Sequence, residues 1–403
     1  GRDALRRSLH REAARLLEGA IEALAKFPRT PRVYRRLASA RLDLADAYFP
    51  LGRRKDAEHQ LNGAQQAARR SGDARTLTRA WSSLTLHHWV AGNMPTAHRI
   101  GTRALKLAQE KGYVDLTLTC LARIGAMATE RGNCVLARRS LEEAMRIAAS
   151  RPAPKHVGLL IAPLPFQGPL AIALAQAGDY REAIALCDEA LTKAEASSHL
   201  FSQVYALWTA GTVYLHQGNF ERSTEILGRA VRLSRTIGST LLVRQIVSAM
   251  GYSLLHVGRP EEGCALLEDA VGATTSDPMV GQLPQHLAWL SLAKLALGQH
   301  AQAAVVARRA IALARRNGQR TYEAWALYAL SRAQRTTDPR GASRSIAQAR
   351  AIALRCGLAP LVARTDGGWG ASEAESADAD IPPSAEVLGN RGRHLRLVRG
   401  VGA

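Results

Sequence analysis

His216 and His256 are the residues of this chain whose type and spacing come nearest to a chemical site. Each lies two residues before a glycine, in copies of the same local phrase that are 40 residues apart. A metal site would require further ligands, but the equivalent positions in the neighbouring copies are Gln176 and Ala296. We therefore expect no metal here, and we expect the two histidines to contribute to a wall that faces a ligand.

Sequence motifs for catalysis are absent. The dipeptide Gly-Lys does not occur, so a Walker-type phosphate loop is excluded, and no H-E-x-x-H, G-x-S-x-G or dinucleotide fingerprint is present. Pairs of carboxylates such as Glu142-Glu143 and Asp188-Glu189 fall on predicted exposed helix faces, where a solvated surface accounts for them. The sequence predicts a chain that is not an enzyme and holds no cofactor.

The elements that would position any site come from a phrase that recurs about every 40 residues. Each copy ends in an alanine and has another small residue seven positions earlier; in most copies a glycine lies five positions before that. The alanines are Ala20, Ala64, Ala104, Ala144, Ala190, Ala230, Ala270, Ala310 and Ala349, and the glycines are Gly52, Gly92, Gly132, Gly178, Gly218, Gly258 and Gly298. A repeat of this length is typical of a solenoid built from stacked supersecondary units.

The copy around Gly178, LAIALAQAGDYREAIALCDEALTKAEASSH, shows what one unit is. Apolar residues recur at steps of three and four on both sides of a Gly-Asp turn, which predicts two amphipathic helices. Gly178 can take the left-handed conformation that ends the first helix, and Asp179 can cap the second. The unit is therefore a helical hairpin, and the small residues allow its two helices to approach closely.

These residues resemble the tetratricopeptide repeat (TPR). AGDYREAIALCDEAL follows the Gly-Asp-Tyr turn and two-alanine pattern of that family closely, and QGNFERSTEILGRAV follows it nearly as well. The resemblance covers residues 1 to about 360 and implies an all-α fold, a right-handed α-solenoid of about nine TPR-like hairpins. The period near 40 exceeds the 34 residues of the standard repeat, so we expect each helix to be about one turn longer.

One interval departs from this period. The spacing from Gly132 to Gly178 is 46 residues, and the extra residues fall in a proline-rich stretch. Its prolines are Pro152, Pro154, Pro163, Pro165 and Pro169, which we expect to prevent a regular helix. The stretch is interpreted either as a bend between two sub-arrays or as an exposed docking loop.

Four segments follow from these patterns. We predict an N-terminal sub-array over residues 1–150, a proline-rich connection over 151–170 and a C-terminal sub-array over 171–365. Residues 366–403 are rich in small, acidic and turn-forming residues and end in a basic stretch, so they are predicted to be a disordered tail. Because the chain lacks an initiator methionine and begins within the pattern, we expect it to be part of a longer protein.

The TPR resemblance also implies where a ligand would bind. In that family the inner, concave surface is made by the first helices, at positions 13, 10, 6, 3 and 2 before the turn glycine. The candidate binding residues on this face are Arg79, Trp89, Tyr205, Trp208, His216, Gln245, Tyr252, His256 and Gln285. Aromatic side chains with polar neighbours suit the capture of a peptide or small ligand. The alternative is that Trp208, Trp289 and Trp325 only fill gaps between the longer helices.

Charge and composition narrow the possible partners. The net charge of +20 comes almost entirely from arginines that are spread over every unit, which is typical of solvated helix ends, so we expect no nucleic-acid partner. No run of about 18 apolar residues predicts a membrane span, and the charged N-terminus does not resemble a secretory signal. Five widely spaced cysteines favour a reducing, cytoplasmic compartment.

The succession of units suggests a context. LHREAARLLEGAIEALAKFP and the units after it resemble the C-terminal repeat region of bacterial multidomain proteins with a class III adenylate/guanylate cyclase domain and an AAA-type ATPase domain. They are similar, more weakly, to the sensor arm of large ATP-binding transcriptional activators. This implies a regulatory scaffold that binds a protein partner or a neighbouring ATPase or cyclase domain. A small-molecule (inducer) sensor is the alternative, and both remain open.

Overall fold

The computed structural model describes residues 1–6, 10–49, 51–150, 156–157, 160–161, 164–197, 199–236, 242–276 and 281–366. Apart from Asp366, the predicted disordered tail lies outside these residues, as does much of the predicted connection. The described helices are α1 (Arg2–Arg6), α2 (His10–Ala25), α3 (Pro31–Tyr48), α4 (Arg54–Ser71), α5 (Ala74–Val90), α6 (Met94–Glu110), α7 (Val114–Glu130), α8 (Cys134–Ser150), α9 (Leu164–Ala177), α10 (Tyr180–Ala196), α11 (Leu200–Gln217), α12 (Phe220–Thr236), α13 (Val243–His256), α14 (Pro260–Ser276), α15 (Leu283–Ala296), α16 (His300–Asn317), α17 (Arg320–Gln334), α18 (Pro339–Cys356) and α19 (Ala359–Asp366).

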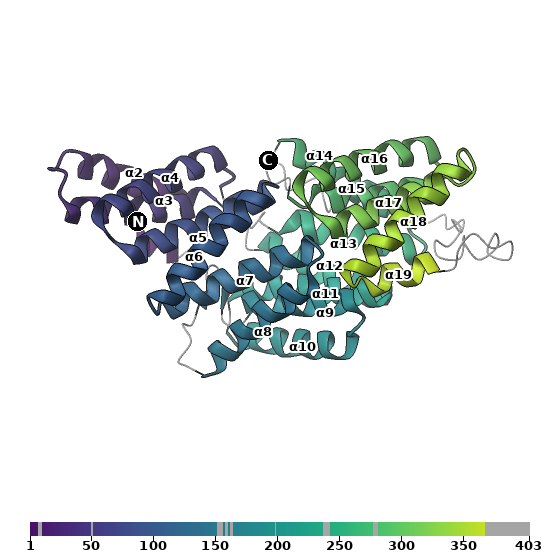
Figure 1. The fold of residues 1–403 in the computed structure, drawn as a ribbon, viewed down its shortest axis with the longest axis horizontal. Helices are drawn as coiled ribbons and strands as arrows, with labels where there is room; N and C mark the ends of the chain where they lie inside the picture. The colour runs from purple at the N-terminus through teal and green to yellow at the C-terminus, as the bar shows by residue number, and fades with distance from the viewer. Residues whose placement is uncertain are drawn as a thin grey trace.

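Successive helices pack in pairs, from α1 with α2 to α17 with α18, and α19 follows the last pair (Figure 1). The only other described elements are the two-residue strands β1 (His156–Val157) and β2 (Leu160–Ile161), which pair antiparallel. The predicted all-α solenoid of about nine TPR-like hairpins is therefore confirmed.

The recurring glycine and alanines act as the pattern predicts within each hairpin. Gly178 has a φ of 91°, and the amides of Gly178 and Asp179 donate to the carbonyl oxygens of Ala175 and Leu174, which ends α9. In the second helices the recurring alanines are buried, with the exception of Ala20. Close approach is direct at α11 and α12, where the Ser223 hydroxyl donates to the carbonyl of Gly211 over 2.8 Å. Small residues thus set the spacing within a hairpin.

Helix α9 begins earlier than expected. It starts at Leu164 and contains Pro169, so the expectation that prolines exclude a helix up to residue 169 is wrong. Pro165 lies in the first turn, where no intrahelical bond to its nitrogen is needed, and Pro169 removes one bond only. Burial of Phe166 and Leu170 against the neighbouring helices offsets that loss. Helix α9 packs on α7 and α8, so the stack of hairpins continues past the proline-rich stretch.

First helices lie on the inside of the curved stack. Helices α3, α5, α7, α9, α11, α13, α15 and α17 contact each other in sequence order as well as their own second helices. One apolar cluster runs from Leu118 of α7 to Leu361 of α19. A separate cluster joins the first three hairpins, from Ala4 to Ala104, with Cys120 of α7.

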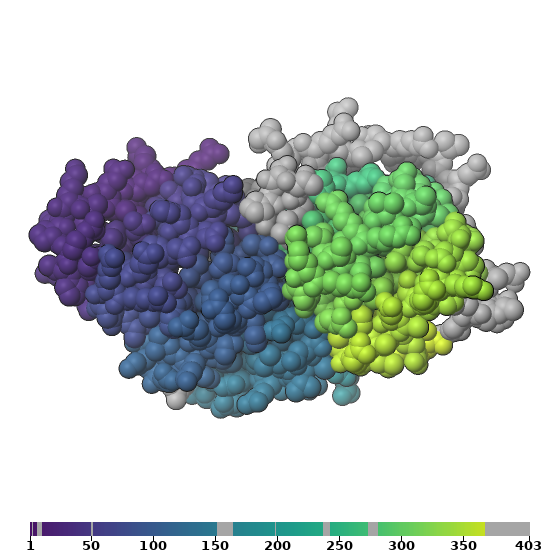
Figure 2. Space-filling model, turned by 45° about the horizontal axis from the view of Figure 1, so that its top comes forward, coloured from purple at the N-terminus to yellow at the C-terminus, as the bar shows by residue number. Residues whose placement is uncertain are grey.

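The curve is tight enough for the hairpins of α5–α8 to meet the last two hairpins, α15–α18. Gly281, before α15, donates its amide to the carbonyl of Val90 at the end of α5, over 2.9 Å. The Thr321 hydroxyl of α17 donates to the carbonyl of Thr129 in α7 over 2.7 Å. Figure 2 shows the green hairpins of α14–α17 lying directly against the blue hairpins of α5–α8. We call this meeting of α5 and α7 with α15 and α17 the closure contact.

Candidate functional site

Two of the predicted binding residues, Arg79 and Trp89 of α5, have structural partners. Arg79 lies between Asp43 and Asp46 of α3, with Nη2 at 2.9 Å and 2.7 Å from their carboxylate oxygens. Trp89 donates from Nε1 to Oε1 of Glu130 over 3.0 Å. These two side chains hold neighbouring first helices together rather than facing a cleft.

Glu130 is the centre of the closure contact. Its Oε2 accepts from Gln319 Nε2 over 2.8 Å, and the same amide nitrogen lies 2.7 Å from the carbonyl of Gly281. Burial raises the pKa of Glu130 to about 7, against the lowering effect of the hydrogen bonds from Gln319 and Trp89. A single carboxylate therefore links α5, α7 and α17 and changes charge near neutral pH.

On α11, Tyr205, Trp208 and His216 are predicted binding residues. Tyr205 and Trp208 pack against each other with ring centroids 5.6 Å apart, and Tyr205 also contacts Gly168 of α9. His216 is buried, and neither of its ring nitrogens has a hydrogen-bond partner among the described residues. Burial, and secondarily the charge of Arg364, lower the pKa of His216 to about 4, so its ring is neutral at pH 7.

Gln245 of α13 and Gln285 of α15 are half-buried. The side-chain oxygen of Gln245 is enclosed and has no partner among the described residues. One residue after Gln285, His286 is buried, and that burial lowers the pKa of its ring to about 3. The inner face of these helices thus contains uncharged polar groups between apolar ones.

Tyr252 and His256 of α13 belong to an aromatic cluster. The ring of His256 stacks on Phe220 with centroids 4.0 Å apart, and the ring of Tyr252 stacks on Trp289 of α15 at 5.2 Å. Trp325 of α17 approaches Tyr252 edge-on at 6.4 Å. Tyr252, Trp289 and Trp325 are almost fully buried, so Trp289 and Trp325 fill the space between first helices, whereas Trp208 is only half-buried.

A cleft lies at one edge of this cluster. Tyr252, Leu255 and His256 of α13, Leu292 of α15, Tyr328 and Arg332 of α17, and Arg364 of α19 line it. We call it the α13–α19 cleft. It contains two of the predicted residues, Tyr252 and His256, whereas the other predicted residues lie elsewhere.

Two arginines give this cleft its charge. Arg332 donates from Nη1 to the Tyr328 hydroxyl over 3.1 Å, and Arg364 donates to the carbonyl of Pro360 over 2.8 Å. The guanidinium of Arg364 lies 5.6 Å from the centre of the Trp325 ring. Among the described residues that line the cleft, none is acidic. Aromatic walls with two guanidinium groups suit a ligand that carries carboxylates.

Sequence reasoning missed Leu255, Tyr328, Arg332 and Arg364. Trp325, Tyr328 and Arg332 follow each other at steps of three and four, so a stripe on α17 was visible in the sequence. Arg364 had no such signal, because α19 lies beyond the last hairpin and reaches the cleft only by packing on α18 and α9.

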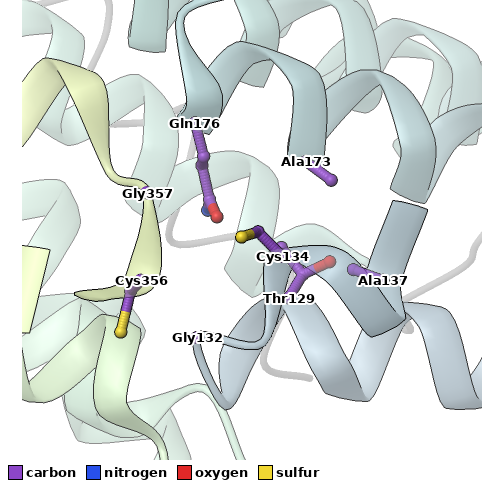
Figure 3. Close-up of a pocket in the computed structure, with 8 residues that line it drawn as sticks. All are labelled: Thr129, Gly132, Cys134, Ala137, Ala173, Gln176, Cys356 and Gly357. Carbon is purple, nitrogen blue, oxygen red and sulfur yellow. The ribbon is translucent and has the colours of Figure 1, made fainter. Parts of the chain in front are cut away.

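A second cleft lies where the α7–α8 turn meets the α18–α19 turn (Figure 3). Small side chains such as Ala137 and Ala173 and the backbone of Gly132 and Gly357 form much of its lining. Cys134 and Cys356 also line it, but their side chains do not point toward each other (Figure 3). All five cysteines of the chain are free thiols. The arrangement offers a ligand little polar chemistry.

The described part of the chain contains neither a metal site nor a membrane span. No group of three histidine, cysteine, aspartate or glutamate residues there is arranged to hold a metal ion. None of the described helices combines the length and apolar character needed to cross a bilayer.

Comparisons with known proteins agree with this architecture. Residues 170–197 match the family model of the tetratricopeptide repeat, the segment that contains the Gly178 turn. No curated protein is detectably similar to the chain in sequence.

Among solved structures, a Rap protein complexed with Competence and Sporulation Factor superposes with a TM-score of 0.66 at 10% identity, over 88% of this chain and 95% of that chain. The Rap conjugation gene regulator of plasmid pLS20 in complex with the Phr* peptide gives a TM-score of 0.54 at 13% identity, over 90% of this chain and 93% of that chain. NprR in complex with its cognate peptide NprX superposes with a TM-score of 0.50 at 12% identity, over 74% of this chain and 83% of that chain. At these identities the likeness is one of fold, and the chain is similar to TPR-type helical repeat proteins.

Proposed function

We propose that this chain is a non-catalytic regulatory scaffold that binds an extended, acidic segment of a protein partner in the α13–α19 cleft. The observation that carries the proposal is the cleft itself, where Arg332 and Arg364 lie beside the rings of Tyr252 and Tyr328. Guanidinium groups form paired hydrogen bonds with carboxylates, and aromatic walls offer area for apolar neighbours along the same segment.

The comparisons support a segment of polypeptide as the ligand. The pLS20 regulator and NprR were each solved with a peptide bound, the Rap protein was solved with Competence and Sporulation Factor, and each is similar in fold to this chain. A stack of first helices with an accessible inner edge can take an extended segment by its side chains, without a deep enclosed pocket.

We propose further that the partner segment belongs to an ATPase- or cyclase-type signalling module, either in the same protein or in another chain. The resemblance of the repeat succession to the C-terminal region of bacterial cyclase–ATPase proteins supports this. Five free thiols support a reducing compartment such as the cytoplasm.

Arg332→Gln is expected to weaken binding of acidic peptides about tenfold, because one charge-assisted contact contributes roughly 1.5 kcal/mol or more. The measurement is fluorescence anisotropy with labelled ten-residue peptides that differ only in carboxylate number. Arg308→Gln is the matched control, since it removes the same charge from the exposed face of α16. Equal affinities for acidic and amidated peptides, or equal losses in the two variants, would reject the site.

The small-molecule sensor remains the second candidate, because the aromatic rings and the two guanidinium groups of the cleft also suit a small compound that carries a carboxylate. A metabolite panel in a thermal-shift assay separates the two. Stabilisation by one compound that Arg332→Gln abolishes, without binding of any acidic peptide, would favour the sensor.

A further inference from the structure

Helices α16 and α18 differ in charge from every other described second helix. Neither contains an aspartate or a glutamate, whereas α2, α4, α6, α8, α10, α12 and α14 each contain at least one. Both pack on α17, so they belong to neighbouring hairpins of the stack (Figure 1). The arginines of the chain are spread over every unit, but on these two helices no carboxylate of the same helix neutralises them.

The arginines of both helices share their exposed side with an aliphatic residue. On α16 the exposed side carries Val305, Arg308, Arg309 and Arg316. On α18 it carries Arg340, Arg344, Leu354 and Arg355. We call these eight residues the α16–α18 face.

The carboxylates near this face are already engaged in the fold. Residues 281–366 contain three, and two of them, Glu323 and Asp366, form ion pairs with arginines outside the face. The third, Asp338, accepts from the amide of Gly341 at the start of α18 over 2.8 Å. The six arginines of the face have no ion-pair partner among the described residues. Their charge is therefore open to an anionic partner.

The two aliphatic residues indicate which anionic partner fits. Val305 is 64% exposed and Leu354 is 52% exposed. Guanidinium groups beside exposed aliphatic side chains suit an anionic bilayer, where charges meet lipid headgroups and apolar groups enter the boundary with the acyl chains. A nucleic-acid backbone would engage the arginines through its phosphates but would leave both aliphatic side chains in water.

We propose that the α16–α18 face binds the surface of an anionic lipid bilayer, with Val305 and Leu354 at the acyl boundary and the arginines against the headgroups. In this arrangement the chain lies on the bilayer surface. The α13–α19 cleft is lined by first helices and α19, so the two sites use different elements. The proposal therefore stands or fails without the proposed function.

The test is co-sedimentation of the full chain with vesicles of phosphatidylcholine, either alone or with about 30% phosphatidylserine. We expect binding to the anionic vesicles only, and about tenfold weaker binding at about 0.5 M salt than at about 0.1 M, because charges are then screened beyond about 4 Å. Equal binding to both kinds of vesicle, or binding to neither, would overturn the proposal even if a variant failed to fold. No peptide is present, so the outcome is independent of the α13–α19 cleft.

A variant with four substitutions tests the arginines of the face: Arg308→Gln, Arg309→Gln, Arg340→Gln and Arg344→Gln. Its affinity for the anionic vesicles should fall about fiftyfold or more, because each basic residue near such a surface contributes about fivefold. The matched control removes the same charge from exposed positions of second helices that contain carboxylates, by Arg139→Gln, Arg146→Gln, Arg181→Gln and Arg232→Gln. The control should lose less than about threefold. Equal losses in the two variants would contradict a defined face.

Val305→Ser with Leu354→Ser tests the apolar part of the face without changing its charge. Binding to the anionic vesicles should weaken about fivefold, because less apolar area leaves water. Unchanged binding would reject the bilayer as the partner. Tighter binding of a DNA duplex than of the vesicles, lost in the four-arginine variant, would also overturn the proposal and assign the face to nucleic acid.

Discussion

Gly263→Ala is expected to destabilise the chain by about 3 kcal/mol or more, as overpacking between two helices does. A methyl group on Gly263 in α14 would lie 2.5 Å from the carbonyl oxygen of Gly251 in α13. The obstacle is backbone rather than a flexible side chain, so the two helices would have to separate. Since α13 carries Tyr252 and His256, the same change should also distort the α13–α19 cleft.

Gly272→Ala on the same helix is the matched control, and we expect it to stabilise the chain. No atom lies within 4 Å of a methyl group at that position. Alanine is favoured over glycine within a helix by about 0.5–1 kcal/mol. The measurement is urea denaturation of both variants followed by circular dichroism. An unchanged free energy of unfolding in Gly263→Ala would contradict the close approach of α13 and α14.

We expect the closure contact to weaken as pH rises, because the carboxyl group of Glu130 then ionises. Its pKa in the folded chain is about 7, above the 4.5 of an unperturbed glutamate, so the folded state binds the proton more tightly than the unfolded state. The contribution of protonated Glu130 to the stability of the fold is fully present below about pH 4.5 and is lost as pH rises through 7. Between pH 5 and 8 the loss is about 2–3 kcal/mol.

This effect is measured as the difference in unfolding free energy between the wild type and Glu130→Gln across that pH range. The glutamine variant should gain stability relative to the wild type as pH rises, because it carries no ionisable group. Glu221→Gln, at an exposed position of α12, should show no such trend. Hydrogen exchange at the amide of Gly281, which bonds to Val90, reports the same opening locally. A pH-independent difference for Glu130→Gln would contradict the prediction.

Local rules in the sequence predicted the hairpins well. Gly178 and the alanines of α10 act as the repeated phrase predicts. The expectation that Asp179 caps α10 is wrong in one respect, because Asp179 lies at the N-cap position but its side chain makes no capping hydrogen bond. The backbone preferences of Pro165 and Pro169, taken alone, predict a later start for α9 than the structure shows. Packing of Phe166 and Leu170 outweighs these preferences.

Candidate site residues were predicted less well, since position within a repeat does not reveal how strongly the stack curves. Arg79 and Trp89 occupy inner-face positions but bind Asp43, Asp46 and Glu130. Tyr252 and His256 reach the cleft, yet its charge comes from Arg332 and Arg364.

The sequence by itself determined the repeating unit of this protein and its all-helical class, because these depend on periodic burial and on turn residues close together in the chain. Only the tertiary structure decided that Glu130 of α7 meets Gln319, the residue before α17, and that Arg364 of α19 lines the α13–α19 cleft. Both depend on the accumulated curvature of many stacked hairpins, a sum of small packing angles that no single repeat encodes.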